Sequence, residues 1–141
     1  MSVARQLWGE HLMLNVLGIF IGGGLGAALR YGISHLISER HDAVFPWGTF
    51  AVNVIGAFVI GLLFQLFDRI FLTVEARNLI TIGLIGAFST FSIFTMECLI
   101  LLRGGHLGVG ILYFFGSGFA GLAAVSLGLF IGEIVLRMMR Y

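Results

Sequence analysis

The chain has 141 residues, of which 59% are hydrophobic and only 11% are charged, and its formal net charge is +1. A soluble domain carries about 25% charged residues, so the bilayer must be the main solvent of this chain. The near-neutral charge argues against nucleic acid as a partner. The single cysteine, Cys98, excludes an intramolecular disulfide and a cysteine-based metal cluster.

Four apolar segments are each long enough to cross a bilayer, which takes about 20 residues per helix. They run over roughly residues 12–36, 47–67, 79–102 and 107–136. Pro46 suits the first turn of the second segment, where its missing N–H costs little. The connections are short, and no linker divides the chain. We therefore predict an all-α integral membrane protein with a single domain, 1–141, of four transmembrane helices.

The second segment carries a polar residue, Asn53, with Thr49 one helical turn before it. The Asn53 amide offers two donors and an acceptor. One interpretation is an interhelical hydrogen bond that holds the bundle together. The other is a place on an ion pathway.

The third segment contains the most informative stretch, Gly83 to Phe94. Its glycines and three clustered hydroxyl residues, Ser89, Thr90 and Ser92, weaken regular helix. Lipid gives no reason to cluster hydroxyls, because polar groups at that depth must be satisfied within the protein or by a passing solute. We predict a broken third helix beside a permeation path, with a simple kink as the alternative.

Phe91 and Phe94 are three residues apart and therefore share a helix face. Ordinary packing is one explanation. The other uses the ring quadrupole, whose positive edge solvates a small anion without binding it tightly. Stronger donors beside such rings would suit conduction, which needs sites that are favourable yet easily left.

Several further polar residues lie within or near the spans, each with two interpretations. Arg30 either snorkels to the interface or draws anions to a pore mouth. Glu97 either pairs with a neighbouring helix or couples transport to protons. Tyr113 and Ser117, four apart in the fourth segment, either pack with satisfied hydroxyls or line a path.

No histidine pair has metal-ligand spacing, and no nucleophile or phosphate-loop motif appears, so we predict that the chain is not an enzyme. Glycines recur at every fourth position in the first and fourth segments. These glycines either pack helices within one subunit or admit a second copy. They are Gly18, Gly22, Gly26, Gly128 and Gly132.

Two features bear on assembly. No internal repeat is evident, so a symmetric transporter would need two copies of the chain. The bias of loop arginines is weak, which leaves room for insertion in both orientations. One side carries Arg5, Arg69, Arg77, Arg137 and Arg140; the other carries Arg40 and Arg103, with Arg30 near the boundary.

These features resemble one family, the Fluc (CrcB) fluoride channels. The resemblance rests on Gly23 to Tyr31, on Pro46 to Thr49 followed by Asn53 and Gly56, and on Gly83 to Glu97. It implies a dual-topology homodimer of antiparallel subunits in the inner membrane of a prokaryote. Such dimers hold two separate pathways that passively export fluoride from the cytoplasm and relieve its toxicity.

The resemblance also assigns residues. It makes Phe91 and Phe94 the pore phenylalanines, and Asn53 a fluoride-coordinating amide. The backbone carbonyls of Gly86 and Ser89, from both subunits, would hold a structural sodium ion. The predicted fluoride pathway comprises Asn53, Phe91, Phe94, Ser92, Tyr113, Ser117 and Thr49, with Arg30 at the vestibule.

The chain departs from the family pattern at two positions. Ile93 replaces a threonine between the two phenylalanines, and Gly121 replaces a hydroxyl residue one turn after Ser117, which Ser126 is poorly placed to restore. Two other functions stay open at this point. One is a small proton-coupled multidrug antiporter using Glu97, and the other is a non-transporting membrane subunit.

Overall fold

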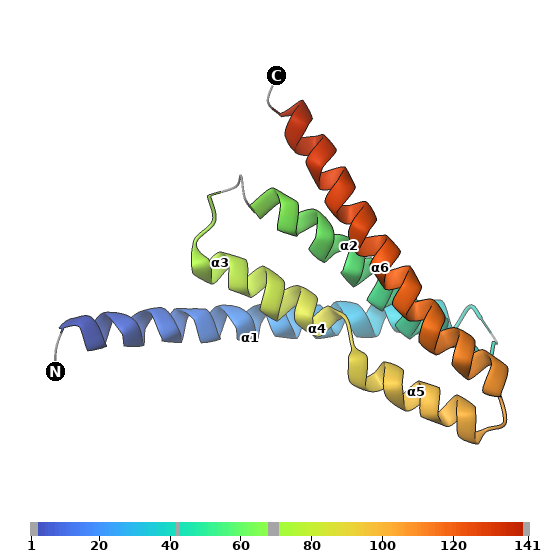
Figure 1. Ribbon diagram of the computed structural model, residues 1–141. Helices are drawn as coiled ribbons and strands as arrows, with labels where there is room; N and C mark the ends of the chain where they lie inside the picture. Colours follow the sequence, from blue (N-terminus) through green and yellow to red (C-terminus); the bar gives the residue numbers. More distant parts are fainter. Residues whose placement is uncertain (1–2, 42, 68–70, 140–141) are drawn as a thin grey trace.

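The computed structural model describes residues 3–41, 43–67 and 71–139, and all its regular elements are helices (Figure 1). Among these described residues, four stretches are long and apolar enough to cross a membrane, as predicted: His11–Ser38, Trp47–Phe67, Val74–Arg103 and Leu107–Met138. Arg69 and Arg140, counted above among the loop arginines, lie outside the described residues. The helices are α1 (Val3–Ser38), α2 (Trp47–Phe67), α3 (Val74–Asn78), η1 (Leu79–Ile85), α4 (Gly86–Phe88), α5 (Phe91–Arg103) and α6 (Leu107–Met138).

Two helices extend beyond the predicted spans. α1 begins at Val3 and has 36 residues, and α6 continues to Met138. At 1.5 Å per residue α1 is about 54 Å long, well above the roughly 30 Å of a hydrocarbon core. Hydropathy marks only the lipid-facing part of a helix, whereas its backbone hydrogen bonds continue into the polar region.

The third span is not one regular helix. α3 runs into η1, a seven-residue π-helix, and then into the short α4. Ser89 (φ −84°, ψ 160°) and Thr90 (φ −148°, ψ 124°) are extended, and α5 starts anew at Phe91. The chain changes direction at this point, so that α5 leaves the line of α4 (Figure 1).

Glycines of α1 allow the third span to lie directly against it. A Cβ atom on Gly22 would sit 2.3 Å from the Leu79 carbonyl oxygen, and one on Gly26 would sit 2.1 Å from the Leu84 carbonyl oxygen. Such distances are impossible for a real side chain, so the backbones are in contact here. Two interpretations of these glycines were given above, and the structure shows the first: Gly22 and Gly26 pack helices of the same subunit against each other.

Glycine contacts also join α2 to α6, which lie side by side in Figure 1. A Cβ atom on Gly61 would lie 2.3 Å from the Val125 carbonyl oxygen, and one on Gly128 would lie 2.2 Å from the Phe58 carbonyl oxygen. Gly132 abuts Gln65 further along α6. This contact sets how close the polar residues of α2 and α6 come to each other.

Polar side chains hold α3 in place beside α1 and α2. His11 Nδ1 lies 3.1 Å from a Glu75 oxygen, and Asn78 donates to Asn15 at 3.0 Å. Arg77 donates to the Phe67 carbonyl at the end of α2, also at 3.0 Å. The start of the third span is thereby anchored to two other helices.

A tight turn joins α5 to α6. The His106 N–H donates to the Leu101 carbonyl at 2.9 Å, and Gly105 adopts a positive φ of 82°. This pattern is a Schellman helix end, in which glycine takes the left-handed conformation at little cost. The short turn makes α6 return beside α5.

The α2–α6 contact leads to a first prediction. Gly128→Ala should lower the thermal unfolding midpoint in detergent, because the new methyl group meets backbone atoms and overpacking costs about 1–3 kcal/mol. Gly108→Ala is the matched control in α6, since a Cβ there meets nothing within 4 Å. Equal midpoints for the two variants would contradict the proposed contact.

Candidate functional site

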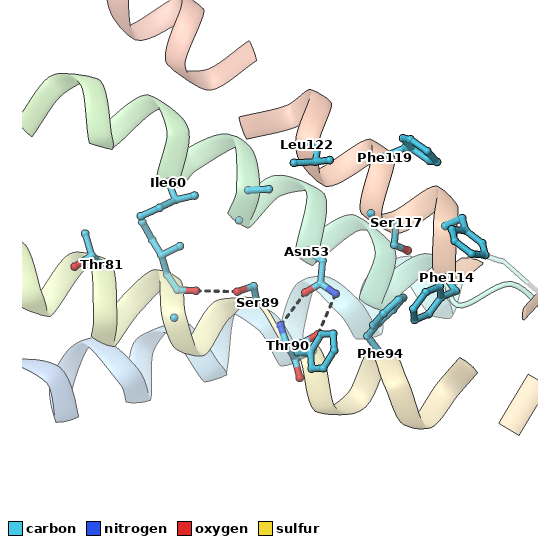
Figure 2. Close-up of a pocket in the computed structure, with 17 residues that line it drawn as sticks. Asn53, Ile60, Thr81, Ser89, Thr90, Phe94, Phe114, Ser117, Phe119 and Leu122 are labelled. Carbon is cyan, nitrogen blue, oxygen red and sulfur yellow. Dashed lines mark hydrogen bonds between the residues drawn. The ribbon is translucent and has the colours of Figure 1, made fainter. Parts of the chain in front are cut away.

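A groove of about 740 Å³ lies between α2, the third span and α6. It is centred on the interruption between α4 and α5, and most of its wall is apolar or aromatic (Figure 2). Five polar residues contribute to the wall. They are Asn53, Thr81, Ser89, Thr90 and Ser117.

Asn53 is paired with the backbone of Thr90, across the groove wall in Figure 2. The Asn53 amide donates to the Thr90 carbonyl at 3.0 Å, and the Thr90 N–H donates to Asn53 Oδ1 at 2.7 Å. An extended residue presents its N–H and C=O on the same side, so one primary amide satisfies both. One N–H of the Asn53 amide is not used in this pairing.

The Ser117 hydroxyl is buried and has no hydrogen-bond partner among the described residues. It comes from α6 and lines the same groove as Asn53. By contrast, Ser126 is exposed and donates to the Leu122 carbonyl at 2.8 Å. Ser126 therefore does not replace the hydroxyl that is missing at Gly121.

The two phenylalanines of the third span both line the groove but differ in exposure. Phe94 is 7% exposed, whereas Phe91 is 75% exposed, and their ring centroids are 6.0 Å apart. Phe94 stacks on Phe114 at 5.8 Å and meets Tyr113 edge-on at 5.0 Å. Phe94 is thus fixed by its neighbours, while Phe91 stands at the open side of the groove.

Glu97 lies next to this aromatic cluster, and both of its carboxylate oxygens are hydrogen-bonded. Its two carboxylate oxygens accept hydrogen bonds from Thr49 and from Tyr113, each at 2.8 Å. Tyr113 is completely buried and Thr49 is 5% exposed. The structure therefore shows the first interpretation of Glu97, pairing with neighbouring helices, and the two partners belong to α2 and α6.

The structure brings some predicted site residues together and leaves others apart. One groove is lined by six of them: Asn53, Phe91, Phe94, Ser117, and the two residues predicted to hold sodium through their backbone carbonyls, Gly86 and Ser89. Four other predicted residues are not part of its wall. Thr49 and Tyr113 bond to Glu97, Ser92 is exposed on α5, and Arg30 is half-buried on α1.

Sequence reasoning missed several wall residues, namely Phe114, Phe115, Phe119 and Thr81. The α6 aromatics gave no signal, because phenylalanines are common throughout the chain. In the sequence, Thr90 stands out only as one of three clustered hydroxyl residues in the third span. A threonine just before a new helix is a typical N-cap, and Thr90 Oγ1 indeed accepts the Ile93 N–H at 3.4 Å.

Known proteins resemble this chain over most of its length. The family model for CrcB-like protein, Camphor Resistance (CrcB), matches residues 17–129. A Bacteroides fragilis protein named fluoride-specific ion channel FluC is 42% identical over 124 residues, which cover 86% of this chain and 98% of the relative. A FluC protein of Thermus thermophilus is 43% identical over 120 residues (85% and 96%).

A third relative, FluC of Acidobacterium capsulatum, is 40% identical over 124 residues, covering 87% of this chain and 99% of its own. The family is one of ion channels, which confirms that the chain is not an enzyme and disfavours the antiporter alternative. The resemblance drawn from the sequence motifs is therefore confirmed. The chain belongs to the CrcB family, the family of the fluoride-specific ion channels FluC.

Proposed function

We propose that this chain is a passive fluoride channel that exports the anion from the cytoplasm and relieves fluoride toxicity. The observation that carries the proposal is the unpartnered Ser117 hydroxyl in a groove shared with Asn53 and Phe94. A buried hydroxyl without a partner is costly, and an anion is a natural acceptor for it. The names of the relatives agree with fluoride as that anion.

Fluoride is small and strongly hydrated, so it enters only where dense donors replace its water. Ser117 and the spare N–H of Asn53 are the strong donors of the groove. The rings of Phe91 and Phe94 add weaker positive edges. This mixture favours entry without deep trapping, as conduction requires.

The active form in this proposal is a homodimer of antiparallel subunits in the inner membrane, with two pathways. One chain leaves the groove open, since Phe91 at its edge is 75% exposed. A second copy in the opposite orientation closes it, and the third span then acts as a broken membrane helix. In this proposal Ser92 continues the pathway beyond the groove, Thr49 and Tyr113 support its wall through their bonds to Glu97, and Arg30 attracts anions at the vestibule.

A structural sodium ion completes the proposed dimer. Gly86 and Ser89 both line the groove next to the extended segment, and backbone carbonyls are the hard oxygen ligands that such a cation takes. Two oxygens from each copy would hold the ion. When bound, it would supply a fixed positive charge to the dimer.

The experiment that tests the channel is fluoride efflux from liposomes that contain only the purified chain. Efflux should proceed without a proton gradient, and Glu97→Gln should leave it largely intact, because the amide oxygen still accepts from one of the two hydroxyls. A strictly proton-driven exchange that vanishes in Glu97→Gln would instead establish the antiporter. Absence of flux would favour a non-transporting subunit.

Ser117→Ala should slow fluoride efflux about tenfold or more, since hydrogen bonds to charged groups contribute about 1.5–3 kcal/mol. The stopped-flow or electrode trace of liposome efflux gives the rate. Ser126→Ala is the matched control in α6, because Ser126 bonds only to its own helix. If both variants conduct at the wild-type rate, the Ser117 hydroxyl does not contact the anion.

Phe94→Ile and Phe91→Ile should each reduce efflux several-fold while preserving the dimer. The replacement keeps an apolar side chain but removes the ring quadrupole. Phe130→Ile serves as the control, since Phe130 is an exposed α6 phenylalanine that does not line the groove. Dimer content is measured by size-exclusion chromatography, and wild-type rates in both variants would remove the rings from the mechanism.

A further inference from the structure

The interruption of the third span separates four backbone N–H groups, those of residues 90–93, from their helical acceptors, and two of these donors go to side chains. In a continuous α-helix the Gly86 carbonyl would accept the Thr90 N–H, and the Ser89 carbonyl would accept the Ile93 N–H. Neither pairing is present among the described hydrogen bonds. The two donors instead go to side chains.

Asn53 Oδ1 takes the first donor, the Thr90 N–H, at 2.7 Å. The hydroxyl of Thr90 takes the second, the Ile93 N–H, at 3.4 Å. The first bond is short and the second is long, so Asn53 forms the stronger of the two replacement hydrogen bonds. Both acceptors are side-chain oxygens, and each replaces one backbone carbonyl.

The carbonyls that lose these donors belong to Gly86 and Ser89, and both residues line the groove. The Ala87 and Phe88 carbonyls also lose their helical donors, but neither residue lines the groove. Two further carbonyls near the break are occupied. The Ile85 oxygen accepts the Ser89 N–H at 3.2 Å and the Ser89 hydroxyl at 3.3 Å. The Thr90 oxygen accepts the second bond of Asn53 at 3.0 Å. Among the carbonyls that lose a helical donor, those of Gly86 and Ser89 are therefore the ones whose residues line the groove.

We propose that Asn53 and Thr90 are positioning residues that create the cation-binding carbonyls of the third span. Asn53 releases the Gly86 oxygen and keeps the Thr90 oxygen occupied, and the Thr90 hydroxyl releases the Ser89 oxygen. This inference rests on the proposed function, because it concerns the sodium ion proposed there. It gives Asn53 a task that is separate from contact with fluoride.

The test is the effect of sodium on thermal unfolding of the purified full-length protein in detergent. Sodium chloride replaces N-methyl-D-glucamine chloride at constant ionic strength, and the midpoint is compared. The wild type should gain several degrees in sodium, because a ligand of the folded state stabilises it. Asn53→Leu should lose most of that gain, and Thr90→Val should lose part of it.

Thr95→Val is the matched control for Thr90→Val. The Thr95 hydroxyl lies one turn further along α5 and donates to the Phe91 and Ser92 carbonyls, so its loss leaves Gly86 and Ser89 untouched. The control should show the wild-type sodium gain. A full gain in both Asn53→Leu and Thr90→Val, or no gain in the wild type, overturns the inference.

Asn53→Asp covers the case in which Asn53→Leu does not assemble. Its carboxylate keeps an oxygen that accepts the Thr90 N–H, so the sodium gain should persist, and loss of the gain overturns the inference.

Fluoride efflux from the same preparations separates the two proposals. Absence of efflux from the wild type contradicts the fluoride channel, whatever the sodium response. If Asn53→Leu abolishes efflux but keeps the full sodium gain, Asn53 serves only the anion, and the positioning role is wrong.

Discussion

The pairing of Asn53 with the Thr90 backbone is the interaction on which the arrangement of the site depends. Within lipid, backbone N–H and C=O groups that leave a helix have no water to bond with. Two extended residues in the third span are therefore tolerated only where another group satisfies them. Asn53 donates to the Thr90 carbonyl at 3.0 Å and accepts from the Thr90 N–H at 2.7 Å. These two bonds satisfy the backbone of one extended residue, so the helix can be interrupted without leaving these groups unpaired.

Glycines bring together the helices on either side of that pairing. Gly22 and Gly26 let α1 support the third span from one side, and Gly61 and Gly128 let α6 lie against α2. The first contact holds the extended segment in place, and the second brings Ser117 to the groove that Asn53 lines. Packing of small residues thus replaces the hydrophobic effect, which has little force between helices in lipid.

The remaining polar groups divide into satisfied and unsatisfied ones. Glu97 accepts hydrogen bonds from Thr49 and Tyr113, so this cluster joins α5 to α2 and α6. The two hydroxyl donors are therefore already used within the protein. Ser117 keeps an unused donor beside Phe94. The contrast places the capacity to solvate an anion in the groove.

The sequence by itself determined the four spans, the family and the short list of unusual residues, because apolar length and motif spacing are local properties of the chain. It left open whether Asn53 and Glu97 bond to other helices and whether the α1 glycines face the same subunit. Only the tertiary structure decided these points, by joining residues 37 and 48 positions apart. It also placed Phe91 at an open edge and Phe94 in a packed cluster, although both occupy the same helix face. The physical reason is that hydrogen-bond partners and burial depend on how distant helices meet, which no local pattern encodes.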